Sequence, residues 1–205
     1  MSAYAPVTSE ADLEALYGQP GEASLLKVAD RITPQYRRFL DASPFFTLAT
    51  AGPEGLDCSP RGELGGLFRV LDDKRLAIPD RRGNNRMDSL RNIVRDPRVA
   101  LLFLIPGSVT TIRMNGTAIV TVDPDLLASF ETEGHEPRCV IVVTIETVYF
   151  QCARAIMRAD LWNPDERIAA EELPSPGQIM QEIKAGFDGK TYDAQWPERA
   201  RKSMW

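Results

Sequence analysis

Histidine is nearly absent from this chain: His135 is the only one in 205 residues. It lies in Glu131–Pro137, a loop-like stretch of glycine, proline and charged residues, where a lone histidine is usually solvated. The sequence therefore argues against a histidine-based catalytic triad and against a metal site built from several histidines. If the chain is an enzyme, we expect a bound cofactor to supply its chemistry.

Cysteine is also scarce, and Cys58, Cys139 and Cys152 are an odd number at wide spacings. They form no disulfide framework, and no pair has the spacing of metal ligands. No apolar run approaches the roughly 18 residues that a membrane span needs. The acidic start, Met1–Pro20, lacks the basic segment and apolar segment of a secretory signal. These absences predict a cytoplasmic protein.

The overall composition is that of one soluble globular domain. Hydrophobic residues make up 43% of the chain and charged residues 26%, a balance typical of folded proteins. The net charge of -5 gives the whole molecule no attraction to nucleic acid or anionic lipid. We therefore expect neither as a partner.

The hydrophobic pattern predicts a mainly β fold, a β-barrel with flanking helices. Strands are expected at 45–50, 67–71, 75–79, 99–105, 109–122 and 140–150, and Gly116 marks a bend or bulge in the long one. Helices are expected after Ser9, after Thr33, and at 85–95, 124–131, 152–161 and 178–184. Many antiparallel strands with few helices between them indicate a closed or partly closed barrel.

We divide this single domain (1–205) into N-terminal helices (1–42), the barrel (43–164) and a C-terminal helical extension (165–205).

Positive charge is concentrated in one segment of an otherwise acidic chain. Between Lys74 and Arg98 lie eight basic and three acidic residues, so this segment carries +5 and the rest of the chain -10. The centre of the segment, Asp80–Arg86, follows a predicted strand and precedes a predicted helix. The N-terminus of a helix offers free backbone N–H groups, and arginine grips phosphate oxygens with two parallel donors.

Two interpretations of this segment stay open on the residues alone. It is a cradle for one phosphate group, or it is a solvated basic helix start that balances an acidic protein. Nucleic acid is a weaker alternative, because no aromatic residue for base stacking falls between Lys74 and Arg98.

The order of several motifs resembles the pyridoxamine 5'-phosphate oxidase-like family of FMN-binding split barrels. The opening strands are similar over Pro44–Ala51, Cys58–Gly62 and Leu76–Asp80. Asn84–Ile93 resembles the phosphate-binding helix of the family, and Asp96–Phe103 and Thr111–Ala118 resemble the strands that follow it. The similarity extends over residues 43–164 and is most specific over 76–118. It implies an antiparallel, Greek-key split barrel.

The resemblance also implies a cofactor, FMN, and the residues that hold it. Ile78, Pro79 and Asp80 would lie along the flavin ring and ribityl chain. Asn84, Asn85 and Arg86 stand where the family has a Ser-Arg-Lys element for the FMN phosphate, so Asn85 replaces an arginine and Arg81 or Arg82 would supply the missing charge. Arg61 matches a second basic position near the phosphate, and Thr111 stands where the family often has a glutamine at the ring edge. Sites of this family use both subunits, so a homodimer is implied.

One departure from the family limits the function. True pyridoxamine-phosphate oxidases end in a segment with Trp, Arg and His residues that binds the vitamin phosphate, and the tail Pro197–Trp205 does not reproduce it. We therefore expect no role in vitamin B6 synthesis. The closer likeness is to probable FMN-dependent enzymes of undefined substrate, for which NAD(P)H is a candidate electron donor.

Residues outside these motifs have simpler interpretations. Cys152, Arg154 and Arg158 either line a substrate pocket or, as we favour, are a small buried hydrophobe and two loop-holding arginines. Trp162 is expected at the barrel edge or a dimer interface, and Trp196 and Trp205 either cover a partner's flavin or dock on the surface. Asp57 and Glu63 are interpreted as solvated charges at strand ends.

The leading hypothesis is an FMN-dependent oxidoreductase acting on a small molecule. The alternatives are a binding module that stores or senses flavin, a deazaflavin or haem on the same barrel, and a generic β-barrel interaction protein. The catalytic residues are not assigned, and no metal ligand is predicted.

Overall fold

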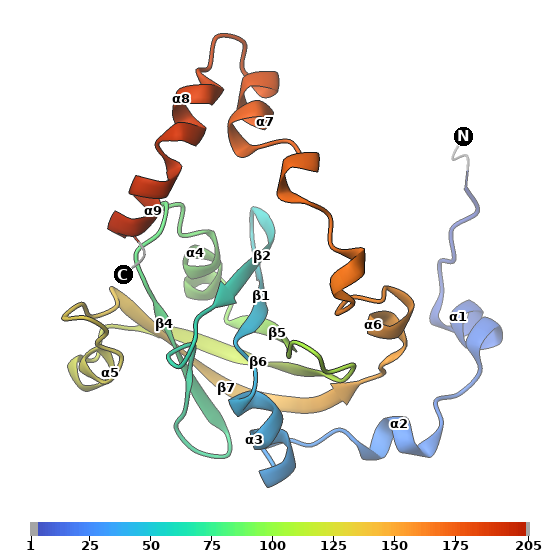
Figure 1. Cartoon of the computed structure of the whole chain (residues 1–205). Coiled ribbons are helices and arrows are strands. Elements are labelled where there is room, and N and C mark those ends of the chain that lie inside the picture. The colour runs from blue at the N-terminus through green and yellow to red at the C-terminus, as the bar shows by residue number, and fades with distance from the viewer. Residues whose placement is uncertain (1–3, 204–205) are drawn as a thin grey trace.

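A computed structural model of the protein, which describes residues 4–203, contains one antiparallel sheet with strands of unequal length, surrounded by short helices (Figure 1). The strand order is β2-β1-β5-β6-β7-β4-β3, and every neighbouring pair is antiparallel. Its strands are β1 (Phe45–Gly52), β2 (Gly55–Gly62), β3 (Arg69–Val70), β4 (Arg75–Asp80), β5 (Arg98–Leu104), β6 (Thr111–Thr121) and β7 (Cys139–Gln151). The predicted mainly β class is confirmed. The strand predicted at 67–71 is reduced to two residues.

The sheet curls around a large apolar core. Most buried apolar side chains of β1, β4, β5, β6 and β7 belong to one contiguous cluster, in which Phe46 of β1 packs against Phe103 of β5 with ring centroids 5.0 Å apart. Ala77 of β4 and Val140 of β7 belong to a second, smaller cluster with Phe130. β5, predicted as a strand at 99–105, buries Val99, Leu101 and Phe103 and leaves the residues between them half-buried. A flat sheet could not bring β1 and β4, which three strands separate in the order, into one cluster, so the curvature determines where the core lies.

The bend predicted at Gly116 is confirmed. The pairing of β6 with β7 shifts register between Asn115 and Gly116. A Cβ atom at Gly116 would lie 2.0 Å from the carbonyl oxygen of Thr144, so only glycine lets the two strands approach at this point. Such irregularities let a sheet turn a corner.

Nine α-helices and two 3-10 turns are described within residues 4–203. They are α1 (Glu10–Tyr17), α2 (Glu22–Leu26), α3 (Pro34–Asp41), α4 (Asp88–Arg95), α5 (Pro124–Ser129), α6 (Arg154–Arg158), η1 (Pro164–Glu166), η2 (Ala170–Glu172), α7 (Pro176–Ile183), α8 (Gly189–Ala194) and α9 (Trp196–Ser203). Ser9 and Thr33 cap α1 and α3 with their side chains, as predicted. None of the described helices is both long and apolar enough to cross a membrane.

The start predicted for α4 is wrong by three residues. Asn85 and Met87 have φ values of 60° and 59°, which an α-helix cannot contain. The segment 81–87 is therefore an irregular turn, and α4 begins only at Asp88. The helix packs on the sheet through Asn92, whose side-chain amide donates to Thr50 Oγ1 at 3.1 Å.

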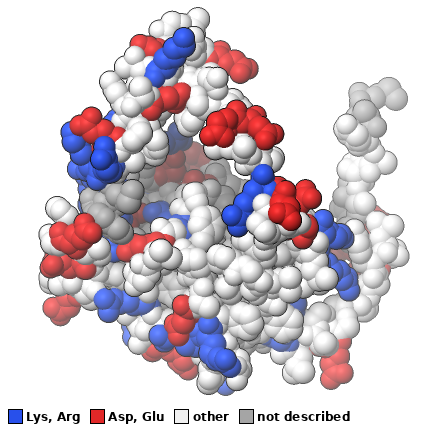
Figure 2. Space-filling view, viewed as in Figure 1, with Lys and Arg blue, Asp and Glu red and all other residues white. Residues whose placement is uncertain are grey.

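Two chain segments lead away from the curled sheet (Figure 1). The N-terminal one carries α1 and α2. The C-terminal one, predicted as a helical extension, leaves through α6 and arches to α9, with a hollow visible between it and the sheet (Figure 2). Its helices α7 and α8 approach closely at Gly177 and Gly189. Any side chain on Gly177 would prevent this approach, because its Cβ atom would lie 2.2 Å from the carbonyl oxygen of Gly189.

Side-chain ion pairs join the two ends of the sheet where no strand pairing is described. In the hydrogen-bonded order β2 is at one edge and β4 is next to the other. Yet Arg61 of β2 donates to Asp80 of β4 at 2.8 Å, and Arg81 donates through Nε and Nη2 to both oxygens of Glu63 at 2.7 and 2.8 Å. The curled sheet is thus held together at its split by charged side chains.

Removing one carboxylate from this junction should be costly. The Arg81 and Glu63 side chains are only 13% and 11% exposed. Glu63→Ala leaves a buried guanidinium without its carboxylate and is expected to lower the free energy of unfolding by about 3 kcal/mol, measured by urea denaturation. The matched control is Asp41→Ala, which removes an exposed partner of Arg37 and should change stability by less than about 0.5 kcal/mol. Equal effects of the two substitutions would contradict this view of the junction.

Candidate functional site

A cleft of about 970 Å³ lies at the split of the sheet. Its walls come from β2 and the residues after it, the end of β4, the turn 81–87, the start of α4 and the start of β7. Five arginines and three carboxylates line it, so the lining is net positive: Arg61, Arg81, Arg82, Arg86, Arg138, Glu63, Asp80 and Asp88. Leu67, Ile78, Pro79 and Leu90 supply apolar surface. A ligand that is part apolar and part anionic fits this lining.

Eight of the nine residues predicted for the site lie together in this cleft. They are Arg61, Ile78, Pro79, Asp80, Arg81, Asn84, Asn85 and Arg86. Thr111 does not line the cleft: it is buried at the start of β6, opposite Gln151. The predicted contact of Thr111 with the edge of a flavin ring therefore stays a prediction, because Thr111 lies outside this cleft.

Arg61 has unused hydrogen-bonding capacity in the cleft wall. Its Nη1 donates to Asp80 Oδ2, but its Nε is buried and has no partner among the described residues. Burying a charged donor without an acceptor is unfavourable. An anionic oxygen in the cleft is the kind of group that would satisfy it.

The beginning of α4 also faces the cleft without a cap. Met87 occupies the N-cap position in a left-handed conformation and makes no side-chain hydrogen bond to the helix. Asp88, Ser89 and Leu90 of the first turn line the cleft. Free N–H groups at the start of a helix attract anions, so this helix end adds to the field of Arg61.

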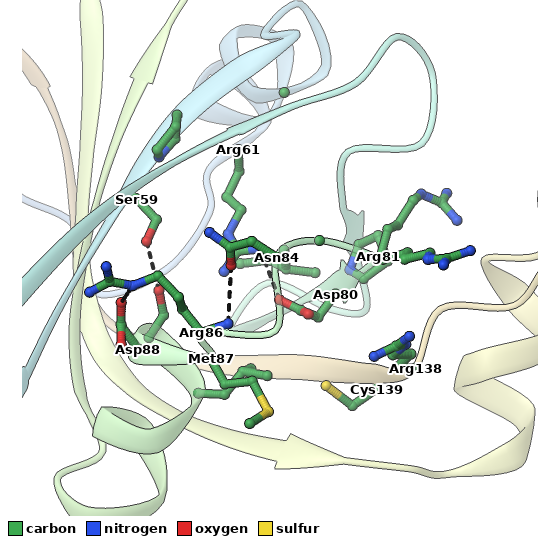
Figure 3. Close-up of a pocket in the computed structure, with 18 of the residues that line it drawn as sticks. Ser59, Arg61, Asp80, Arg81, Asn84, Arg86, Met87, Asp88, Arg138 and Cys139 are labelled. Carbon is green, nitrogen blue, oxygen red and sulfur yellow. Dashed lines mark hydrogen bonds and ion pairs between the residues drawn. The ribbon is translucent and has the colours of Figure 1, made fainter. Parts of the chain in front are cut away.

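The turn 81–87 is held in shape by its two asparagines. The side-chain oxygen of Asn84 accepts from the backbone N–H of Arg86 at 3.1 Å (Figure 3). The side-chain oxygen of Asn85 accepts from Arg138 at 2.8 Å. Arg86 itself is 75% exposed and pairs with Asp88 at 2.7 Å. The predicted phosphate-binding triplet is thus a shaped turn whose cation already has a carboxylate partner.

One prediction about charge is corrected. Arg81, predicted with Arg82 as a source of the missing charge, donates to Glu63, the carbonyl of Phe130 and Thr132 Oγ1, and its role at the phosphate stays a prediction. Glu63 is therefore not the solvated charge predicted. Of the two arginines proposed to replace the missing family cation, Arg82 is exposed at the rim of the cleft.

Asp57 is also not simply solvated. Its Oδ2 accepts from Ser59 at 2.7 Å and from Ser89 at 2.5 Å, and the two hydroxyl oxygens are 2.8 Å apart. This cluster ties β2 to the first turn of α4 beside the cleft. Carboxylates held among hydroxyls leave no pattern in the sequence that distinguishes them from surface acids.

The remaining predicted residues lie elsewhere. Cys152, Arg154 and Arg158 are exposed and do not line this cleft, so the expectation that Cys152 is a buried hydrophobe is wrong. Trp162 lies at the barrel edge, where its indole N–H donates to the carbonyl of Ser108 at 2.7 Å. Trp196 is near the guanidinium of Arg199, with 5.8 Å between the Arg199 Cζ and the ring centroid. The prediction for Trp205 falls outside the described residues.

Sequence reasoning missed Arg138 and Cys139 as cleft residues. Cys139 is the first residue of β7 and Arg138 directly precedes it; β7 pairs with β4 so that Cys139 is opposite Asp80. Burial, followed by the nearby charge of Asp80, raises the pKa of the Cys139 thiol to about 11, with Arg61 opposing the shift. The thiol is therefore neutral near pH 7. Only the pairing of these two strands, distant in the sequence, could have placed these residues in the site.

Comparison with known proteins agrees with this picture. A family sequence profile described as pyridoxamine 5'-phosphate oxidase matches residues 32–152. No curated protein sequence matches significantly.

Solved structures of similar chains come from several bacteria. HupZ of Group A Streptococcus is 16% identical, with a TM-score of 0.49 over 58% of this chain and 93% of its own. A pyridoxamine 5'-phosphate oxidase-related, FMN binding protein of Nostoc punctiforme is 14% identical, with a TM-score of 0.45 over 60% of this chain and 85% of its own. Because the family profile covers more than half of the sequence, including every described strand and the whole cleft, the chain belongs to the pyridoxamine 5'-phosphate oxidase family.

Proposed function

We propose that the chain is an FMN-dependent oxidoreductase whose cofactor binds in the cleft at the split of the sheet. The observation that carries the proposal is the buried Nε of Arg61, which has no partner among the described residues and lies in the same cleft as the uncapped start of α4. A phosphate group satisfies both features, because it accepts charge-assisted hydrogen bonds from guanidinium and backbone N–H groups alike.

The same cleft accounts for the other parts of the cofactor. Ile78 and Pro79 at the end of β4, together with Leu67, offer apolar surface for a flavin ring. Asp80 is held by Arg61, which keeps a carboxylate at a defined position beside that surface. Bound FMN would supply reversible one- and two-electron transfer. The residues of the chain bind it, orient it and keep water from its apolar side.

The family resemblance extends this proposal to partners. We propose a homodimer with a site formed by both subunits, a small-molecule substrate, NAD(P)H as electron donor, and a cytoplasmic location. Vitamin B6 synthesis is not proposed, because His135, the only histidine, lies exposed in the turn at Thr132–His135 and does not line the cleft.

The first binding prediction compares two arginines. Arg61→Ala removes a charged donor to the phosphate and should weaken FMN binding by about 1.5–3 kcal/mol, or roughly 10- to 150-fold in Kd. Arg61→Lys should fall between that variant and the wild type, because it keeps a cation for Asp80 but lacks the Nε donor. Arg86→Ala should have a smaller effect, since Arg86 is exposed and paired. Binding is measured by titrating apoprotein with FMN and following flavin fluorescence.

The control for this comparison is Arg75→Ala, which removes an exposed arginine of β4 that pairs with Asp72 outside the cleft. It should leave the affinity unchanged. An unchanged affinity of Arg61→Ala, in a protein that melts at the wild-type temperature, would remove the phosphate from this position.

A further prediction uses the three cysteines as reporters. At pH 8 a thiol reagent should label exposed Cys58 and Cys152 quickly and Cys139 slowly, because burial lowers its thiolate fraction. Saturating FMN should protect Cys58, which lines the cleft, and not Cys152, which lies outside it. Mass spectrometry of each cysteine peptide measures the rates. Equal protection of Cys58 and Cys152 would place the flavin elsewhere.

An anaerobic reduction experiment separates an enzyme from a storage or sensing module. If the protein turns over, anaerobic NADH or NADPH should bleach the flavin absorbance band of the FMN-loaded protein, and air should restore it. The control is free FMN at the same concentration. Failure of both donors and of a chemical screen of two-electron donors to reduce the bound flavin would favour the module.

A further inference from the structure

We infer that the N-terminal segment of one chain docks on the outer face of α4 in a second copy of the chain. Every described residue from Tyr4 to Leu26 is exposed, although α1 within this segment is a well-formed helix with Ser9 as its cap. An eight-residue helix is only marginally stable without tertiary contacts. A surface outside its own chain would account for its order.

The exposed side chains of α1 define what such a surface must offer. Glu10, Leu13, Glu14 and Tyr17 follow one another at helical spacing and share one face. Leu13 is 47% and Tyr17 84% exposed. Residues 4–26 hold four acidic side chains and no basic one, and no ion pair is described for any of these acids. The segment therefore requires a partner surface that is basic with an apolar centre.

The outer face of α4 has this character. Arg91, Val94 and Arg95 lie at helical spacing, and Arg98 follows just beyond the helix. Val94 is 76% exposed, a large value for an apolar side chain in a helix that otherwise packs on the sheet. Arg91 has no ion pair among the described residues, whereas Arg95 pairs with Glu54 and Arg98 with Asp96. The acidic side chains of α1 thus match the arginines of this face in charge, and its leucine and tyrosine match the exposed Val94 in polarity.

The contact cannot form within one chain as it is folded. The N-terminal segment is anchored where Ala29 pairs with Val148 of β7, and Lys74 holds Asp30 at 2.7 Å. From this anchor α1 leads away from the sheet, well separated from α4 (Figure 1). An anionic membrane would repel four acids, so the second copy is the occupant we choose. Each copy carries both surfaces, which allows a reciprocal, two-fold exchange.

A crosslinking experiment with two full-length variants tests the docking between chains. The acceptor chain carries Arg91→Lys together with Glu10→Gln and Glu14→Gln, and the donor chain is the wild type. A carbodiimide joins carboxylates only to amines in contact, so neither chain alone can link residue 10 or 14 to residue 91. The mixture should give this link, identified by mass spectrometry of the joined peptides.

Variants of the donor chain test the chemistry of the contact. Glu10→Lys with Glu14→Asp leaves a carboxylate only at position 14 on this face of α1. It should lower the yield of the link about fivefold or more, because a lysine at position 10 then faces the arginines of the partner surface. High salt should lower it as well, since exposed charges are screened. The matched control is an acceptor chain that carries Arg113→Lys in place of Arg91→Lys. Arg113 is an exposed arginine of β6 that lies over Tyr149, and this acceptor should give no link.

A second measurement needs no substitution. Hydrogen exchange of the peptide containing Glu10–Tyr17 in the wild type should slow as protein concentration rises through the dimerisation range seen by sedimentation. No link in the mixture, a link of equal yield with the Arg113→Lys acceptor, or exchange independent of concentration would each overturn the inference. None of these results would bear on FMN binding, because α1 and the outer face of α4 do not line the cleft.

Discussion

The split of the sheet is closed by side chains, and the rest of the site depends on that closure. β2 and β4 lie near opposite ends of the hydrogen-bonded order. Arg61 pairs with Asp80 across the split, and Glu63 pairs with Arg81, so each side supplies one cation and one carboxylate. Backbone hydrogen bonds between these two ends would have closed the sheet and left no cleft. Ion pairs instead hold its ends at a distance that leaves a cleft between them.

This arrangement explains why the arginines of the basic segment have different roles. Arg81 contributes to the closure of the fold, because its guanidinium donates to Glu63 and to two further oxygens. Arg86 is at the surface with Asp88. Arg61, from an earlier strand outside the basic segment, keeps a buried donor that has no partner among the described residues. A local count of positive charge therefore overestimates how much the turn 81–87 contributes to anion binding, and it underestimates the contribution of β2.

The acidic residues are distributed so that the cleft stays positive. Four of them lie in the N-terminal segment, far from the cleft (Figure 1). The carboxylates that line the cleft are paired with Arg61, Arg81 and Arg86. The acid beside the cleft, Asp57, accepts hydrogen bonds from two serines. A chain with net charge -5 can thus present an anion-binding surface, because electrostatic interactions fall off over distances shorter than the molecule.

Local pattern specifies the long strands, the caps of α1 and α3, and the bend at Gly116, because strand periodicity, capping and glycine geometry act over a few residues. The order of the motifs was enough to identify the family, and eight of the nine residues chosen from those motifs lie in one cleft. Tertiary contacts, in contrast, make α4 start at Asp88, bond Glu63 and Asp57 rather than leave them solvated, and add Arg138 and Cys139 to the site. These outcomes depend on residues 18, 32 and 53 positions apart meeting across a curled sheet, and no short-range pattern encodes such a meeting.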